Sequence, residues 1–310
     1  MTELIPVAAC ILIAFGIGSN DTSNALGICI GCGIIRVRKA LLLFGCFVLI
    51  GIMLQGQNVM KTVGKDLLDV NLSIISISLS VSAILIILSN WKKLPLSTHQ
   101  VIIGSLTGSG VASGVDVNFV SLFKIIFSWI ISPLIALFSA VLLYRTMEKT
   151  ISKLSLFRIE KILRVLLLMS GILIAYNTGA NELATILGPI IHSGLMDRIQ
   201  ASVLGTLFIF LGAFLLSHRV IETISKGITI LDPYSGFAAQ FGAGISILFF
   251  TFLGMPISTT YCIIAGISGV GMLKGMKTVR IELIKKIIAN WVLAPSLAFL
   301  ICFVIMKVLK

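Results

Sequence analysis

Apolar runs separated by short polar or charged stretches make up almost the whole chain. Ten of them can be traced, at residues 4–35, 40–60, 70–90, 95–115, 119–144, 161–191, 199–217, 235–253, 255–273 and 286–306. Each is close to the ~20 residues that an α-helix needs to cross a bilayer. The pattern predicts an all-α polytopic membrane protein whose main surroundings are the lipid bilayer, with no soluble domain.

Composition and charge placement support this prediction. Hydrophobic residues make up 57% of the 310 residues and charged residues only 12%, and the formal net charge is +12. The cations lie between the apolar runs and not along one face of a helix, so we expect no nucleic-acid partner. If the chain starts outside, 18 of the 24 Lys and Arg residues fall in cytoplasmic loops, which is the bias that fixes topology. We therefore expect a multi-pass protein of the cell membrane with both termini external.

A run of polar residues interrupts the first apolar segment, and a related run occurs in the second half of the chain. The segment "GSNDTSNALG" at 18–27 contains an acid, and "GANELATILG" at 179–188 contains another acid at the equivalent position. An ionisable residue deep in a membrane marks a functional site by default. The surrounding oxygen donors suit Na⁺, Ca²⁺ or Mg²⁺ rather than soft metals. We expect a cation site within an interrupted helix, with ligands Asn20, Asp21, Asn24, Asn181, Glu182 and Thr185.

A second pair of segments, separated by the same distance along the chain, predicts an anion site. Each of "LPLSTHQ" at 94–100 and "MPISTTY" at 255–261 has a proline followed by hydroxyl residues. Proline suits the first turn of a helix, so the hydroxyls fall where free backbone N–H groups point outward. Two such helix N-termini facing each other form a cradle for an anion. Its predicted residues are Ser97, Thr98, His99, Ser258, Thr259 and Thr260.

The repeated segments also divide the chain. We expect a first repeat at 1–150, a basic cytoplasmic linker at 151–160 and a second repeat at 161–310. An odd number of crossings in each repeat gives two inverted-topology repeats of about five membrane segments each, with broken helices or re-entrant hairpins at the midplane. Residues 70–115 and 235–273 can form either two full crossings or one re-entrant hairpin, whose tip would lie at Pro95 or Pro256.

These motifs resemble the two signature copies of the PiT family of inorganic phosphate transporters, usually written G-A-N-D-x-A-N-A with a P-V-S-T-T-H block. The resemblance implies uptake of inorganic phosphate by symport with Na⁺ or H⁺, through alternating access and often by a homodimer. It implies that Asn20, Asp21, Asn181 and Glu182 bind the coupling cation. It also implies that the hydroxyl residues of the two P-x-S-T segments hold phosphate.

The chain departs from the family pattern at several positions. Glu182 stands where the family usually has Asp, Thr185 where it has Asn, and His99 where it has a hydroxyl. Gln100 and Tyr261 stand where the family tends to have His. A sulfate permease of the same family therefore remains an alternative, because sulfate is also a tetrahedral dianion.

A second alternative is a cation exchanger that uses the paired acids, but such a protein would leave the anion cradle unused. The chain contains no H-E-x-x-H, G-x-S-x-G or P-loop motif, so we do not expect an enzyme. We expect no cofactor apart from the coupling ion, with Na⁺ favoured over H⁺.

Overall fold

The computed structural model describes residues 3–91, 96–151, 155–215, 233–275 and 281–309. The expected hairpin tip at Pro95 and the middle of the expected linker, residues 152–154, lie outside these ranges. The described residues form the α-helices α1 (Leu4–Gly31), α2 (Val37–Lys61), α3 (Leu72–Trp91), α4 (Thr98–Ser113), α5 (Phe119–Ile151), α6 (Leu156–Asn177), α7 (Ala184–His192), α8 (Arg198–Leu215), α10 (Pro233–Phe252), α11 (Thr259–Lys274) and α12 (Ile281–Val308). The same ranges also contain two π-helical segments, η1 (Thr62–Asp66) and η2 (Thr178–Leu183).

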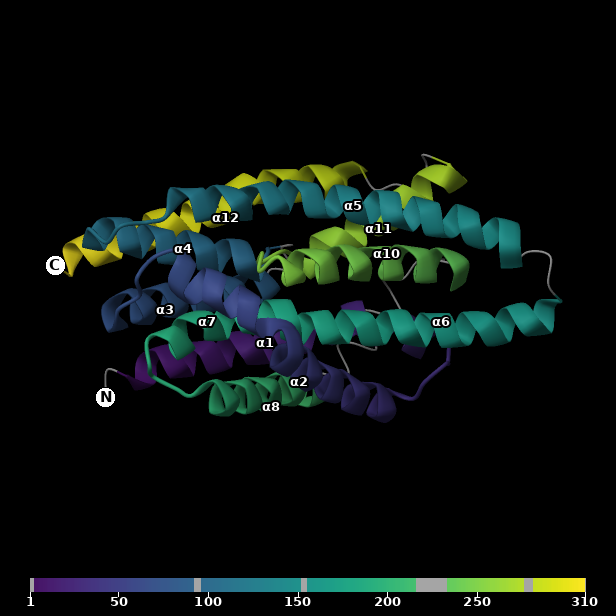
Figure 1. Ribbon diagram of the computed structural model, residues 1–310, viewed down its shortest axis with the longest axis horizontal. Helices are drawn as coiled ribbons and strands as arrows, with labels where there is room; N and C mark the ends of the chain where they lie inside the picture. The colour runs from purple at the N-terminus through teal and green to yellow at the C-terminus, as the bar shows by residue number, and fades with distance from the viewer. Residues whose placement is uncertain (1–2, 92–95, 152–154, 216–232, 276–280, 310) are drawn as a thin grey trace.

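The prediction of an all-α membrane protein is confirmed. Within the described ranges, seven helical segments are long and apolar enough to cross a membrane: α1, α2 with η1, α3, α5, α8, α10 and α12. The helices run mainly along the long axis of the molecule (Figure 1). Large apolar side chains such as Phe138 and Val292 are more than half exposed, as expected for a surface that faces lipid.

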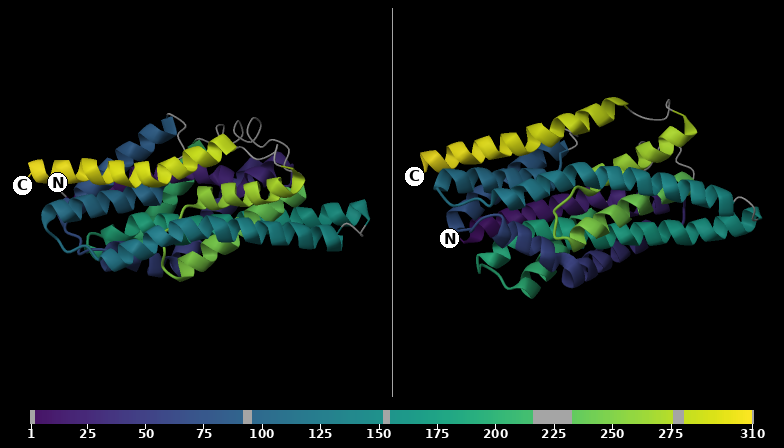
Figure 2. Two further views of the ribbon diagram at one scale, coloured as in Figure 1. Left: turned by 90° about the horizontal axis from the view of Figure 1, so that it is seen from above. Right: turned by 45° about the horizontal axis from the view of Figure 1, so that its top comes forward.

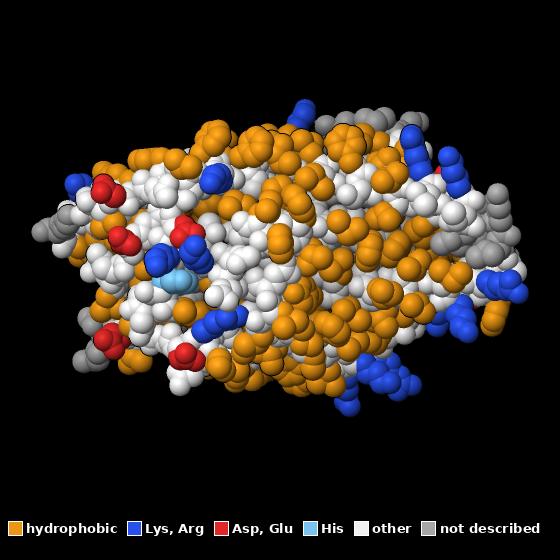
Figure 3. All heavy atoms as spheres, in the orientation of Figure 1, with side chains coloured by type: hydrophobic (Ala, Val, Ile, Leu, Met, Phe, Trp, Pro, Cys, Tyr) orange, Lys and Arg blue, Asp and Glu red, His pale blue; other side chains and the backbone are white. Residues whose placement is uncertain are grey.

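The outer surface is apolar in the middle and charged towards the ends. Figure 3 shows a broad band of hydrophobic side chains between two sets of charged ones. Most acidic side chains on this face lie at the end where both termini are found, whereas the opposite end carries mainly Lys and Arg (Figures 1 and 3). On this face the two ends of the molecule therefore differ in the acidic side chains that accompany Lys and Arg.

Helix bounds follow the sequence repeat. Adding 161 to the bounds of α3 and α4 gives those of α10 and α11, and the starts of α5 and α12 are related by nearly the same offset. Helix α1 starts at the end that holds both termini, whereas α6 starts at the opposite end (Figure 1). Helices α5 and α12 likewise run in opposite directions (Figure 1). Much of the segment expected as a linker is helical, because α5 extends to Ile151 and α6 begins at Leu156.

The two halves of the chain interlock through close backbone contacts. A methyl group on Gly18 of α1 would lie 1.8 Å from the carbonyl oxygen of Ile209 in α8. At the equivalent position of the second half, one on Gly179 of η2 would lie 1.9 Å from the carbonyl oxygen of Val48 in α2. Small residues allow this close approach of membrane helices. Each motif-bearing segment is therefore supported by a helix of the other half.

Helices α3–α4 and α10–α11 form two hairpins that extend from the middle of the molecule toward opposite ends (Figures 1 and 2). Helices α4 and α11 have 16 residues each, or ~24 Å at 1.5 Å per residue. This length is short of the ~30 Å of hydrocarbon in a bilayer. The start of α4 and the start of α11 also line one pocket with Asp21, in the interior of α1. The structure therefore favours hairpins over pairs of full crossings.

The expectation that the first helix is interrupted at its polar run is wrong. Helix α1 passes through it as a continuous α-helix. Its hydroxyl groups bond to the carbonyls of their own helix, with Ser19 Oγ donating to Gly16 O at 2.8 Å and Thr22 Oγ1 to Gly18 O at 2.7 Å. In the second half the equivalent segment is the π-helical η2, which widens the helix without breaking it. Such segments are frequent at functional sites.

Candidate functional site

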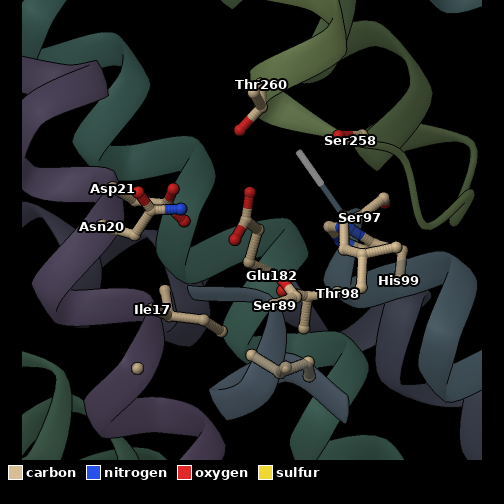
Figure 4. A pocket seen from close by; sticks show the side chains of 13 residues that line it. Ile17, Asn20, Asp21, Ser89, Ser97, Thr98, His99, Glu182, Ser258 and Thr260 are labelled. Carbon is tan, nitrogen blue, oxygen red and sulfur yellow. The ribbon is translucent and has the colours of Figure 1, made fainter. Parts of the chain in front are cut away.

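One pocket in the middle of the molecule brings together the two pairs of sequence motifs (Figure 4). Eight of the twelve predicted site residues line it: Asn20, Asp21, Ser97, Thr98, His99, Glu182, Ser258 and Thr260. They come from α1, η2 and the starts of α4 and α11. Segments from both halves of the chain therefore meet at one site.

Both acids of the repeat line this pocket, and Figure 4 shows the carboxyl group of Glu182 between Asp21 and the side chains of Ser97 and Thr98. Asp21 is 3% exposed and Glu182 is 5% exposed, and among the described residues no Lys or Arg lines the pocket. Two carboxylates about 4 Å apart would repel by ~4 kcal/mol at an effective dielectric constant of about 20. A bound cation or a proton would remove this repulsion.

Both hairpins present the start of a helix to the pocket. Ser97 is the N-cap of α4 and makes no capping hydrogen bond with its side chain, whereas Ser258, the N-cap of α11, accepts one from Tyr261 N at 3.4 Å. Thr98 lines the pocket directly after Ser97. The free N–H groups and hydroxyls of two helix starts are hydrogen-bond donors suited to an anion.

Some buried polar atoms at the site have no hydrogen-bond partner among the described residues. These atoms are Ser97 Oγ, His99 Nε2 and Thr259 Oγ1. Ser97 and His99 line the pocket, and Thr259 lies between Ser258 and Thr260, which also line it. Leaving a buried polar group unpaired costs ~1–3 kcal/mol. Several of them in one place indicate that the site is built to bind a polar ligand.

The remaining predicted ligands lie behind the lining. Asn24 Nδ2 donates to Asp21 Oδ1 at 3.0 Å and to Thr260 Oγ1 at 3.3 Å, so it connects the acid of α1 to the start of α11. Thr185 Oγ1 donates to the backbone oxygen of Asn181 at 2.8 Å. Asn181 directs its amide group to the α10–α11 hairpin. Asn24, Thr185, Asn181 and Thr259 do not line the pocket.

Ser89 of α3, which was not predicted from the sequence, also lines the pocket, together with Leu96, Ile86, Ile17 and Gly16. Residue 250, the repeat counterpart of Ser89, is Phe. The repeat therefore provides no second polar residue that would have marked the position. Near the site, the repeat-equivalent residues Tyr261 and Gln100 contact each other, with Oη donating to Oε1 at 3.5 Å.

A comparison with protein families matches the phosphate transporter family model to residues 17–158 and again to residues 153–302. The chain belongs to the phosphate transporter family. The double match divides the chain close to the position where the repeat does. Members of this family are transporters, so the protein is a membrane transporter and not an enzyme.

Relatives in this family carry the names of two different anions. A candidate phosphate permease of Methanocaldococcus jannaschii is 39% identical over 297 residues, covering 96% of this chain and 94% of that protein. A sulfate permease of Bacillus subtilis is 30% identical over 317 residues, covering 98% and 87%.

A solved structure described as "The sodium-dependent phosphate transporter" has a TM-score of 0.85 and 22% identity. The similarity covers 100% of this chain and 99% of that one. The two proteins therefore have the same fold.

Proposed function

We propose that this protein imports inorganic phosphate together with Na⁺. The observation that carries the proposal is one pocket in which two buried carboxyl groups face two helix N-termini, with no basic side chain among the described residues that line it. The acids suit a cation, and the helix starts suit a tetrahedral oxyanion.

Electrostatics explains why the two ions should bind together. A phosphate dianion ~6 Å from two carboxylates has four like-charge pairs of ~3 kcal/mol each, on the order of 10 kcal/mol in total at an effective dielectric constant of about 20. Two helix N-termini contribute at most ~2 kcal/mol each. Bound cations are therefore needed for the anion to bind. This requirement couples the binding of phosphate to the binding of the cations.

The residues present fit a sodium ion. Asp21 and Glu182 supply charged oxygens, and Asn20 supplies an amide oxygen in the same pocket lining. Na⁺ prefers such hard oxygen ligands. The solved structure with the same fold is described as sodium-dependent, which supports Na⁺ as the coupling cation. Protonation of the two acids is the alternative form of coupling.

Alternating access follows from the arrangement of the halves. We infer that residues 1–150 and 161–310 act as inverted repeats around a site at the bilayer midplane, and their helices that run in opposite directions support this (Figure 1). We place the end rich in Lys and Arg in the cytoplasm and both termini outside the cell membrane. A homodimer is the assembly that we expect.

Sulfate is the second candidate substrate, and the Bacillus subtilis relative favours it. Phosphate at neutral pH can donate a hydrogen bond and sulfate cannot. The pocket contains acceptors for such a bond, namely Asp21, Glu182 and a neutral His99. A site built for a donor discriminates against an isostere that lacks it, so we expect phosphate and arsenate to compete strongly and sulfate to compete weakly.

Uptake into proteoliposomes tests the proposal. Radiolabelled phosphate, sulfate and calcium are offered in parallel, each with an inward gradient of Na⁺ or of K⁺ at the same pH on both sides. We expect phosphate uptake that depends on Na⁺ and is reduced little by excess sulfate. Equal competition by sulfate would move the assignment to a sulfate permease, and calcium uptake without phosphate uptake would favour a cation exchanger.

A further inference from the structure

Two asparagines at equivalent positions of the repeat have different surroundings. Asn20 and Asn181 each directly precede an acid of the pocket. Asn20 is exposed and lines the pocket. Its amide group makes no hydrogen bond with another described residue. Asn20 is therefore free to bind an ion in the pocket.

Asn181 is fully buried, and its amide group is bonded to the α10–α11 hairpin. Its Nδ2 donates to Thr251 Oγ1 at 2.7 Å and to Met255 O at 3.0 Å, and its Oδ1 accepts a hydrogen bond from Ile257 N at 3.0 Å. Both N–H groups and the oxygen of this side chain are thus used within the protein.

These three bonds hold the part of the hairpin that carries the anion cradle. Thr251 lies in the last turn of α10, and Ile257 directly precedes Ser258, the N-cap of α11. Two other side chains bond to carbonyls of the same connection, with Asn58 Nδ2 donating to Phe252 O at 2.9 Å and Trp129 Nε1 to Pro256 O at 2.8 Å. Asn58 and Trp129 each bond to one residue of this connection, whereas Asn181 bonds both to Thr251 at the end of α10 and to Ile257 directly before the cradle.

The position of Asn181 in the chain makes this contact relevant to transport. The next residue is Glu182, whose carboxyl group is directed into the pocket (Figure 4). The bonds of Asn181 therefore set the distance between the acid of the second half and the helix start that faces it. A displacement of about 1 Å between such groups is enough to weaken binding strongly.

We propose that Asn181 is a positioning residue of the anion cradle and that the coupling cation is bound without it. This assignment rests on the proposed function and replaces the expectation that Asn181 is a cation ligand. The two repeat-equivalent asparagines then have different roles: Asn20 binds an ion in the pocket, and Asn181 positions the α10–α11 hairpin.

Hydrogen–deuterium exchange of the full-length protein in nanodiscs tests the contact without any substrate. In Asn181→Ala we expect residues 251–258 to exchange about tenfold faster than in the wild type, because the amide of Ile257 and the loop around it lose their anchor. Asn20→Ala is the matched control, because the same change at the equivalent position removes no bond to this hairpin. Unaltered exchange in Asn181→Ala would overturn the proposal.

Transport kinetics test the role. In Asn181→Ala we expect the KM for phosphate to rise at least about tenfold, as for the loss of a buried hydrogen-bond partner. The Na⁺ concentration for half-maximal uptake, measured at saturating phosphate, should change less than about twofold because no cation ligand is lost. Asn20→Ala should instead raise this Na⁺ concentration.

Two further variants keep the test decisive if Asn181→Ala does not fold. Asn181→Asp keeps the acceptor for Ile257 N but loses both donors, so the KM for phosphate should rise, whereas a cation ligand replaced by a charged one would bind Na⁺ at least as well. Thr251→Val, outside the pocket, should reproduce part of the KM effect and should be non-additive with Asn181→Asp. Additive effects, or a shift in Na⁺ dependence alone, would overturn the proposal.

A wild type that takes up neither phosphate nor sulfate would instead refute the proposed function, and the exchange result would still decide whether the contact exists.

Discussion

The α3–α4 and α10–α11 hairpins have helix bounds related by the repeat, yet different side chains hold each pair together. In α3–α4, buried hydroxyls bond across the pair, with Ser78 Oγ donating to Ser109 Oγ at 2.9 Å and Ser82 Oγ to Ser105 Oγ at 3.0 Å. The counterparts in α10–α11 are Ala239, Val270, Ala243 and Gly266.

The second hairpin replaces these hydrogen bonds by close packing. A methyl group on Gly266 would lie 2.6 Å from the carbonyl oxygen of Ala239, so the two helices approach each other at backbone distance. Hydrogen bonds between buried hydroxyls and close contact of small residues are both ways to join helices in a membrane. The repeat therefore preserves the hairpin and its place at the pocket while the chemistry that stabilises it changes.

The largest expected effect tests a feature that both halves share, an acid that lines the pocket. Asp21→Asn combined with Glu182→Gln should abolish the stimulation of phosphate binding by Na⁺, because both charged cation ligands are lost while the repulsion of the anion is relieved. Calorimetric titration of phosphate at low and high Na⁺ measures this.

The single variants show how far the two acids are equivalent. Each should reduce the dependence on Na⁺ in part, and Na⁺ binding should be helped correspondingly less by phosphate, because coupling is reciprocal. If phosphate binds the wild type equally well with and without Na⁺ at constant pH, the sodium mechanism is wrong and protonation of the acids becomes the better explanation.

The next effect compares the two helix starts. Ser97 Oγ is unpaired and Ser258 Oγ accepts a bond from Tyr261 N. We expect Ser97→Ala to raise the KM for phosphate about tenfold with little loss of stability, and Ser258→Ala to lower thermal stability as well, by the ~1 kcal/mol of a lost cap. Uptake assays and melting in detergent measure the two quantities. A Ser97→Ala variant with wild-type KM would remove Ser97 from the cradle.

A smaller effect contrasts the interiors of the hairpins at equivalent positions. Gly266→Ala places a methyl group against backbone and should destabilise by ~1–3 kcal/mol, as overpacking does. Ser105→Ala, its matched control in α4, loses a side-chain hydrogen bond worth ~1 kcal/mol. Equal melting temperatures of these two variants would contradict the distinction between a closely packed hairpin and a hydrogen-bonded one.

The smallest expected effect comes from replacing the hydrogen-bonded pair Ser78 and Ser109 by Ala and Val, the residues at the equivalent positions of α10–α11. Ser78→Ala alone leaves Ser109 Oγ without its donor and should cost ~1 kcal/mol, whereas Ser78→Ala with Ser109→Val removes both hydroxyls and should cost less. Melting of the four proteins in the double-mutant cycle gives the coupling between the two positions. Strict additivity would show that this hydrogen bond contributes nothing to stability.

Much of the site was predictable because the repeat marks it twice. Asp21 and Glu182, and the Pro-x-Ser-Thr segments that start α4 and α11, occur in pairs with one offset, and the structure places these acids and helix starts in one pocket. Ser89 was not predictable, since its counterpart is Phe250. The continuity of α1 was missed because glycines and hydroxyls can either interrupt a helix or bond to its own carbonyls.

The sequence by itself determined the all-α membrane class, the division into two related halves and the residue types available for ions, because bilayer thickness and helix geometry act on the chain locally. Only the tertiary structure decided which residues at equivalent repeat positions have the same contacts. Asn20 and Asn181 occupy equivalent positions in related segments, but Asn181 has Thr251 and the α10–α11 connection within hydrogen-bond distance whereas Asn20 lines the pocket. A side-chain amide bonds to whichever partner its neighbours supply, and those neighbours come from distant parts of the chain.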